Sequence, residues 1–335
     1  MTKNINTAFS NFIKDFVNLD SDRTSKARSS RNWLIDQIKS IESKNDDFPK
    51  LYKDKNIFFG SFARNTKIRE LDDIDLMICL NANGTTYNEC SNYTKNIELN
   101  VPDSYATLKG LCHDNSTRLN STKVINRFKK HINSIPQYSS AEIHKNMEAL
   151  TLKLSSYEWN FDIVPCFFTA KDSQGKTFYI IPDGNGYWKK TDPRIDRDNI
   201  TTLNQTFDGN LLNVIRLVKY WNREKSIGIN SSYLLETMII NFYSQPNSTC
   251  GTFVDIQFKE VLNYLKSAIL DDVLDLKDIQ GNLNNYTSSE RSDISSSIEN
   301  HYNLVVKATE YELTDIEKCF KKWKEILGGN FPEYE

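Results

Sequence analysis

Paired cysteines are missing from this chain. Its six cysteines stand apart, and no two of them are separated by only two residues. Closely spaced pairs are typical of structural zinc sites, and dense cysteine frameworks are typical of small secreted domains. The sequence therefore disfavours both classes. We expect reduced thiols, in the core or at the surface, at Cys79, Cys90, Cys112, Cys166, Cys250 and Cys319.

Long apolar segments and a leader pattern are missing as well. The sequence has no run of about 20 apolar residues, the length that a helix needs to cross a bilayer. Its first segment, MTKNINTAFSNFIKDF, carries an acidic residue inside its apolar pattern, unlike a signal peptide. These absences exclude a membrane-spanning class, so we expect a cytoplasmic protein with no membrane partner.

An excess of positive charge is a third absence. Lys and Arg number 42 against 44 Asp and Glu, which gives a formal net charge of −2. Proteins that coat DNA or RNA are usually basic, because phosphate contacts supply most of their affinity. We therefore expect no strong DNA or RNA binding. A Walker-type loop of glycines and lysine is absent, and metal-ligand spacing is missing at His113, His131, His144 and His301.

Helical and strand patterns alternate in the first half. The chain has 335 residues, 39% of them hydrophobic, enough for one large core or two modest ones. Helical spacing of apolar residues predicts helices over 5–17, 21–43 and about 119–132. Short β-type segments are predicted at 57–59, 74–80, 150–154, 159–168 and 178–181.

Helical spacing dominates after residue 193. It predicts helices over 211–221, 233–242, 254–270, 298–306 and 316–327. A Ser/Asn-rich segment, 282–297, predicts a loop or a weakly ordered turn. The change of character predicts two domains, one over 1–195 with the sheet and one over 196–335 made of helices.

Two aspartates share one face of a predicted strand. Side chains alternate along a strand, so Ile74, Leu76 and Ile78 form an apolar core face, whereas Asp73 and Asp75 point to the other face. Two like charges this close repel unless a cation lies between them. The pattern therefore indicates a metal-binding strand.

A third acid and a glycine turn extend this pattern. In the segment 157–165, Asp162 points away from the face that carries Trp159 and Phe161, and it either joins a carboxylate group or pairs with an arginine. Gly60 and Ser61 follow a short β-run, where free backbone N–H groups and a hydroxyl suit a phosphate, although Gly-Ser is also a common turn. Three converging carboxylates can bind two Mg²⁺ ions, the machinery of phosphoryl or nucleotidyl transfer.

The layout resembles a known superfamily. Gly60-Ser61, then Asp73-x-Asp75, then Asp162 on a separate strand is similar to the polymerase-beta-like nucleotidyltransferases. The segments GSFARNTKIRELDDIDLMICL, NFDIVPCF, YIIPDGNGYWKKTDP and NVIRLVKYWN followed by SSYLLE look like the bacterial cGAS/DncV-like nucleotidyltransferases, or CD-NTases. The likeness covers the chain to about Phe242. It implies a two-lobed α+β fold, with a mixed sheet lobe and a C-terminal helical lobe resembling that of the oligoadenylate synthetases.

The resemblance also implies roles for single residues. Asp73, Asp75 and Asp162 would be catalytic and would hold two Mg²⁺ or Mn²⁺ ions, with Asp162 beside the acceptor hydroxyl. Gly60 and Ser61 would hold the β- and γ-phosphates of the donor nucleotide. Arg64 and Thr66 match the same motif and either take part or only brace the loop.

Three further residues in the helical half are implied to bind nucleotide. Lys219 of the K-x-W motif would reach the triphosphate, although a helix lysine is more often a solvated side chain. Ser232 would contact phosphate, and Ser231 or Ser232 would begin the next helix. Tyr233 would stack on a base, with a simple core position as the alternative.

The family's activity is the synthesis of cyclic oligonucleotide signals in antiphage defence, known as CBASS. The resemblance thus implies an enzyme that joins nucleoside triphosphates into a cyclic di- or trinucleotide and releases pyrophosphate. The expected substrates are ATP, GTP or both, with pyrimidine nucleoside triphosphates as further candidates. An effector protein would respond to the product, and we expect a monomer. The alternatives are synthesis of linear oligonucleotides, nucleotidyl transfer to RNA or protein, and a catalytically inactive nucleotide-binding regulator.

Overall fold

The computed structural model describes residues 4–89 and 96–334, which divide into two compact units. The first, called the sheet unit, comprises Ser21–Ala63 and Leu71–Arg194. The second, called the helical unit, comprises Arg64–Glu70 together with the described parts of Met1–Asp20 and Ile195–Glu335. Each unit has its own core, and each is described by itself.

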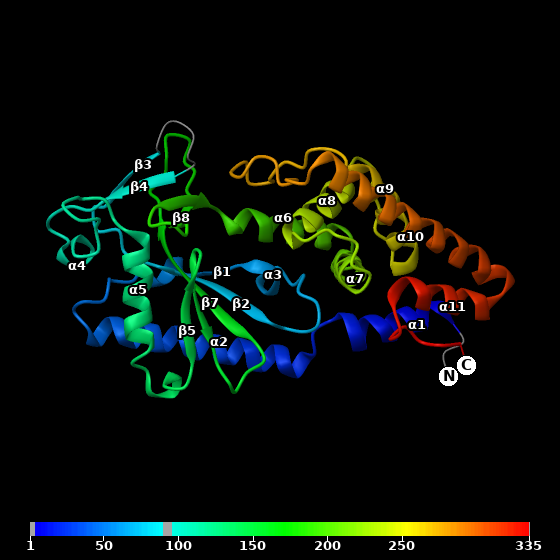
Figure 1. Ribbon diagram of the computed structural model, residues 1–335, viewed down its shortest axis with the longest axis horizontal. Coiled ribbons are helices and arrows are strands. Elements are labelled where there is room, and N and C mark those ends of the chain that lie inside the picture. The colour runs from blue at the N-terminus through cyan, green and yellow to red at the C-terminus, as the bar shows by residue number, and fades with distance from the viewer. Residues whose placement is uncertain (1–3, 90–95, 335) are drawn as a thin grey trace. The chain divides into compact units, whose positions relative to one another are not determined.

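The sheet unit is built on one mixed sheet (Figure 1). Its strands within the described residues are β1 (Ile57–Phe58), β2 (Asp73–Cys79), β3 (Thr86–Glu89), β4 (Asn96–Asn100), β5 (Glu142–Asn146), β6 (Ala149–Lys153), β7 (Asn160–Phe168), β8 (Tyr179–Pro182) and β9 (Trp188–Thr191). The main order is β1-β2-β7-β8-β9-β4-β3, and β6 also pairs with β7 and with β5. The pair β2–β7 is parallel, whereas the pairs β1–β2 and β6–β7 on either side are antiparallel. The predicted mixed α and β fold is confirmed.

Helices cover this sheet. They are α2 (Ser21–Lys44), α3 (Gly60–Ala63), α4 (Ala106–Lys109) and α5 (Ser121–Ile132), with single turns η2 (Lys53–Lys55) and η3 (Pro136–Tyr138). In α5 the Asn120 side chain accepts a hydrogen bond from the backbone N–H of Lys123 and so caps the helix. Val124 and Phe128, one turn apart, are fully buried where α5 contacts β5, β6 and β7.

Four strands were not expected from the sequence. They are β3, β4, β5 and β9, whose residues are largely polar. In β3 no side chain is fully buried, and in β5 exposed and half-buried positions alternate. Neither face of β3 or β5 is buried, so the apolar alternation that reveals β2 and β7 is missing from these two strands. In β4 only Ile97 and Leu99 are apolar, and both are buried.

The helical unit packs around one large apolar core. Its helices are α1 (Ile5–Phe12), the π-helix η1 (Ile13–Val17), α6 (Pro193–Thr206), α7 (Leu211–Glu224), α8 (Ser232–Tyr243), α9 (Val254–Ala268), α10 (Ser288–Thr314) and α11 (Ile316–Leu327). Figure 1 shows α1 (blue) close to α11 (red), and the rings of Phe9 and Trp323 lie 4.8 Å apart between their centroids. The first helix therefore packs with the last ones, whereas the sequence analysis placed it in the domain of the sheet.

The expectation of a loop over 282–297 is wrong for residues 288–297. They form the first part of α10, which begins with a capping box: the Thr287 hydroxyl accepts from the Glu290 backbone, and the Glu290 carboxylate accepts from the Thr287 backbone. Ile294 and Ile298, four residues apart, are buried in the core. Three serines stand between these isoleucines, so the composition of the segment is polar although the two apolar residues have helical spacing.

Two further expectations concern cysteines and membranes. Cys79, Cys112, Cys166, Cys250 and Cys319 are buried free thiols, and Cys90 lies outside the described residues. Among the helices that the structure describes, none combines the length and the apolar character that a membrane span requires.

Candidate functional site

The parallel pairing of β2 with β7 brings two predicted site residues together. Asp75 lies directly opposite Asp162, and Asp73 lies opposite Asn160. Neighbouring strands are about 4.8 Å apart, and paired residues point to the same face. The three aspartates therefore share one face of the sheet, with Asp75 and Asp162 side by side and partly buried.

The same face becomes apolar further along both strands. Met77, Cys79, Val164 and Cys166 continue the alternation from the aspartates and are buried in a small core. The sequence analysis assigned only the opposite face to the core, and the structure buries both. The carboxylates thus lie where a buried apolar strip ends.

The backbone of Gly60 approaches Asp75 closely. The Phe59 N–H donates to the Asp75 carbonyl, which continues the pairing of β1 with β2, and the chain then turns into the single-turn helix α3 that contains Ser61. Gly60 has φ 71°, in the left-handed region. A Cβ atom at this position would lie 1.8 Å from Asp75 Oδ2. Only glycine therefore allows the turn and the carboxylate to occupy these places.

Asp162 has a partner that the sequence analysis did not name. The Thr151 hydroxyl on β6 donates to Asp162 Oδ1 over 2.6 Å, and the two residues are paired across the antiparallel β6–β7 ladder. Sequence alternation gives the face on which each side chain lies, but it does not give which strand lies next to β7. Nothing in the sequence therefore singled out Thr151.

The donors suit a hard cation. Carboxylate oxygens are the ligands that Mg²⁺ and Mn²⁺ prefer, and two adjacent carboxylates favour a cation between them. Within residues 4–89 and 96–334, no group of three or more histidine, cysteine, aspartate or glutamate side chains is placed to hold a metal ion. The paired carboxylates of Asp75 and Asp162, beside the glycine turn, are the observation that favours a cation here.

Lys219 lies in a buried ion network of the helical unit. Its ammonium donates to Glu236 Oε1 over 2.6 Å and to the Thr66 carbonyl over 3.0 Å, and the side chain is 6% exposed. Glu236 also accepts from the Arg64 guanidinium and from the Thr66 hydroxyl. Lys219 is thus not a solvated helix lysine, and Arg64 and Thr66 brace the segment 64–70 against α7 and α8.

Burial and charge act oppositely on this network. Burial lowers the pKa of Lys219, Glu236 raises it, and the nearby cations Arg64 and Lys67 lower it again, so that the net direction is downward. Burial alone would raise the pKa of Glu236, but the charges of Arg64 and Lys219 outweigh it and hold this pKa below its ordinary value. Glu236, which the sequence analysis did not select, is therefore a buried anion that forms ion pairs with both Arg64 and Lys219.

Ser232 and Tyr233 begin α8. Ser231 is the cap, because its hydroxyl accepts from the Leu234 N–H, and Ser232 follows as an exposed residue. The Tyr233 hydroxyl donates to Asp275 over 2.6 Å and also contacts Asp196 and the Lys277 ammonium. Burial raises the pKa of Tyr233 most, and the neighbouring carboxylates of Asp275 and Asp196 raise it further.

The Tyr233 ring carries cations on its surface. Lys277 Nζ lies 4.0 Å from the ring centroid and Arg64 Cζ lies 5.9 Å from it. The hydroxyl, held by Asp275, fixes the ring direction. Tyr233 is thus a half-buried, oriented aromatic ring, and whether it stacks on a base stays a prediction.

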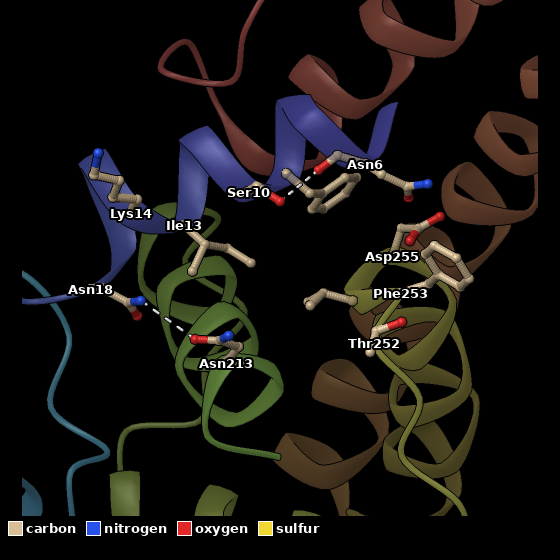
Figure 2. Close-up of a pocket in the computed structure, with 11 residues that line it drawn as sticks. Asn6, Ser10, Ile13, Lys14, Asn18, Asn213, Thr252, Phe253 and Asp255 are labelled. Atoms are coloured by element: carbon tan, nitrogen blue, oxygen red, sulfur yellow. Dashed lines mark hydrogen bonds between the residues drawn. The ribbon is translucent and has the colours of Figure 1, made fainter. Parts of the chain in front are cut away.

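A pocket of the helical unit lies apart from these residues. It has a volume of about 410 Å³ and is lined by α1, η1 and Asn18, by Asn213 of α7, and by residues 252–255 at the start of α9 (Figure 2). Figure 2 shows Asn18 bonded to Asn213 at one end and Asp255 at the other. Burial raises the pKa of Asp255. None of the residues predicted from the sequence to bind nucleotide or metal is among those lining this pocket.

The chain is similar to one curated protein and to several solved structures. No protein-family profile matches the sequence. A curated protein, the probable cyclic nucleotide synthase IK1_05630 of Bacillus cereus (strain VD146), is 44% identical over 337 residues, which covers 100% of both chains. Among solved structures, CdnC of E. coli MS115-1 with ATP has a TM-score of 0.68 at 18% identity and covers 98% of each chain. The Vibrio cholerae cyclic AMP-GMP synthase DncV has a TM-score of 0.58 at 16% identity, over 84% of this chain and 70% of that one.

Proposed function

Because this chain belongs to the bacterial cGAS/DncV-like nucleotidyltransferases and is an enzyme of that class, we propose that it joins nucleoside triphosphates into a cyclic di- or trinucleotide. The single observation that carries the proposal is the pairing of Asp75 with Asp162 beside the Gly60 turn. The B. cereus relative, similar over its full length, supports a cyclic product.

Asp73, Asp75 and Asp162 are proposed, on the family resemblance and on the sheet face that they share, as the residues that hold two Mg²⁺ or Mn²⁺ ions. When bound, such ions neutralise phosphate charge and lower the pKa of a hydroxyl beside them. Carboxylates on one face of two paired strands suit this task, because rigid strands fix their backbone positions.

The bond changes are those of an in-line substitution. A 2′- or 3′-hydroxyl oxygen of one nucleotide attacks the α-phosphorus of another, and the bond from that phosphorus to the pyrophosphate oxygen breaks. Asp162 takes the hydroxyl proton, and pyrophosphate leaves with the electron pair. Gly60 and Ser61 hold the β- and γ-phosphates through backbone N–H groups and the serine hydroxyl. A second such transfer within the linear product closes the ring.

Lys219, Ser232 and Tyr233 are proposed as nucleotide contacts on the family resemblance. The exposed position of Ser232 and the oriented ring of Tyr233 are compatible with this role. Lys219 would have to exchange its bond with Glu236 for one with phosphate. We regard its role in the buried network and its role in binding as separable by measurement.

The proposed setting is antiphage signalling of the CBASS type in the cytoplasm, where nucleoside triphosphates are available. ATP and GTP are the expected substrates, with pyrimidine nucleotides as further ones. The product would act through a separate effector protein, and the enzyme itself would work as a monomer.

One incubation tests the proposal. Purified protein is mixed with the four nucleoside triphosphates, each labelled in turn, with Mg²⁺ or Mn²⁺, and the products are treated with phosphatase, separated and weighed by mass spectrometry. A product whose mass phosphatase leaves unchanged has no terminal phosphate and supports ring closure, and nuclease digestion gives its linkages. The Asp75→Asn variant is the control. Products that all lose terminal phosphates to phosphatase, and so change in mass, would replace the proposal with linear synthesis, and no product would favour an inactive nucleotide-binding regulator.

A further inference from the structure

Three side chains form a row across three strands of the sheet unit. Asp75 on β2 is paired with Asp162 on β7, and Asp162 is paired on its other side with Thr151 on β6. Paired residues point to the same face, so the row reads carboxylate, carboxylate, hydroxyl. The hydroxyl end of this row is already bonded, because Thr151 Oγ1 donates to Asp162 Oδ1 over 2.6 Å.

This bond is well suited to fix a carboxylate. A hydroxyl that donates to an ionised acceptor makes a short, charge-assisted hydrogen bond, and 2.6 Å is typical of one. Thr151 is only 7% exposed, so water has little access to replace the hydroxyl. A β-branched side chain in a strand also has few rotamers. The donor is therefore held in place by its own backbone and burial.

The bond with Thr151 occupies one of the two carboxylate oxygens of Asp162, and Oδ2 is the second acceptor of this carboxylate. A carboxylate offers two acceptor oxygens, and Thr151 engages Oδ1. Residues that bond a metal ligand from behind orient it, and their removal weakens metal binding. The Thr151 hydroxyl is neutral and donates its hydrogen bond to Asp162, so it supports this carboxylate and supplies no charge of its own.

We propose that Thr151 is a positioning residue that holds Asp162 in the orientation in which its carboxylate accepts a divalent cation. The inference rests on the proposed function only in assigning a cation to Asp162. Thr151 touches neither nucleotide nor ion, and it acts through the aspartate.

The sheet unit offers a matched control. Thr169, which follows β7, is 8% exposed, and its hydroxyl donates to the Phe178 carbonyl and accepts from the Phe178 N–H. Thr169→Val therefore removes a similarly buried, hydrogen-bonded hydroxyl that has no aspartate partner among these bonds. Any general effect of deleting a buried threonine hydroxyl in this unit will appear in both variants.

The experiment measures binding of Mn²⁺ alone, by the electron paramagnetic resonance signal of the free ion, to the full chain and to Thr151→Val, Thr151→Ser, Asp162→Asn and Thr169→Val. Thr151→Val is expected to weaken Mn²⁺ affinity about 10- to 100-fold. Thr151→Ser keeps the hydroxyl and is expected to bind as the unmodified chain does, and so is Thr169→Val. In turnover, the Mn²⁺ concentration for half-maximal rate should rise in Thr151→Val more than kcat falls.

Equal Mn²⁺ affinity in Thr151→Val and the unmodified chain would overturn the inference, and so would unchanged affinity in Asp162→Asn. If the valine variant fails to fold, Thr151→Ser against Thr151→Ala makes the same comparison of hydroxyl with no hydroxyl. Failure of the proposed function looks different. In that case the unmodified chain forms no product that lacks a terminal phosphate, while the Mn²⁺ titrations still decide the role of Thr151.

Discussion

Asp75 on β2 and Asp162 on β7 are direct partners in a parallel strand pair. Each belongs to a strand whose other face is buried in the core, so neither carboxylate can turn to the opposite face without breaking the sheet. The repulsion between them is therefore built into the fold. Their proximity gives the first prediction.

Asp162→Asn is expected to reduce product formation by about 10²- to 10⁴-fold, the contribution of a positioned general base, while the protein stays folded. Because the change relieves repulsion with Asp75, the melting temperature in EDTA is expected to stay equal or rise. Chromatography of labelled products and thermal melts in EDTA check both parts. A folded Asp162→Asn protein with the unmodified rate would rule out the assigned role of this carboxylate.

Gly60→Ala is expected to abolish product and to lower the free energy of unfolding by more than about 1 kcal/mol. The new Cβ would collide with Asp75 Oδ2, and the residue has φ 71°. Gly175→Ala is the matched control, because Gly175 has φ 77° with no atom within 4 Å of a built Cβ. Urea unfolding and product assays on both variants separate backbone strain from the collision. Similar activity in the two variants would contradict the importance of the close approach.

Lys219→Met is expected to lower the free energy of unfolding by about 3–5 kcal/mol, because it leaves Glu236 with one cation fewer in a buried site. Lys321→Met, which breaks an exposed pair with Glu317, should change stability little. Titration with a non-hydrolysable ATP or GTP analogue then tests the second role of Lys219. A loss of affinity of about 10- to 150-fold supports a phosphate contact. An unchanged affinity would leave Lys219 a purely structural residue.

Stability is expected to fall in acid through Glu236 and Asp275. Burial opposes ionisation of both, but the bonds and cations around them hold each pKa below its ordinary value, 4.5 for Glu236 and 3.8 for Asp275. A lowered pKa stabilises the fold above the ordinary value, and this stabilisation is lost as the pH falls through the folded-state pKa. Urea midpoints measured between pH 7 and pH 3 check this. In Glu236→Gln the decline below pH 4.5 should be shallower, and an identical decline would contradict the contribution of Glu236.

Alternation along single strands was enough to predict much of the sheet unit. It gave β2, β7 and the face on which Asp73, Asp75 and Asp162 lie, because one side of each strand had to be apolar. It could not give the register that makes Asp75 and Asp162 partners, since strand pairing depends on contacts far apart in the sequence. Thr151 was invisible for the same reason.

The buried polar networks of the helical unit were harder to predict. Lys219 and Glu236 lie on different helices, α7 and α8, and each belongs to a charged residue type that is usually found at the surface. Their burial depends on mutual neutralisation, to which Arg64 contributes as a second cation beside Glu236. In α10, similarly, the apolar residues are sparse and the capping box at Thr287 decides where the helix begins.

The parallel pairing of β2 with β7 also orders events during synthesis. A parallel pair needs a long crossover, and within the described residues that crossover contains β3, β4, α4, α5, η3, β5 and β6. Contacts between distant segments form late, because the loop between them must close first. A nascent chain that has left the ribosome only as far as β6 thus carries Asp75 without its partner. The pair of Asp75 and Asp162 can therefore form only after β7 has been synthesised, when more than half of the sheet unit is complete. A fragment that ends before Asn160 is expected to have no activity.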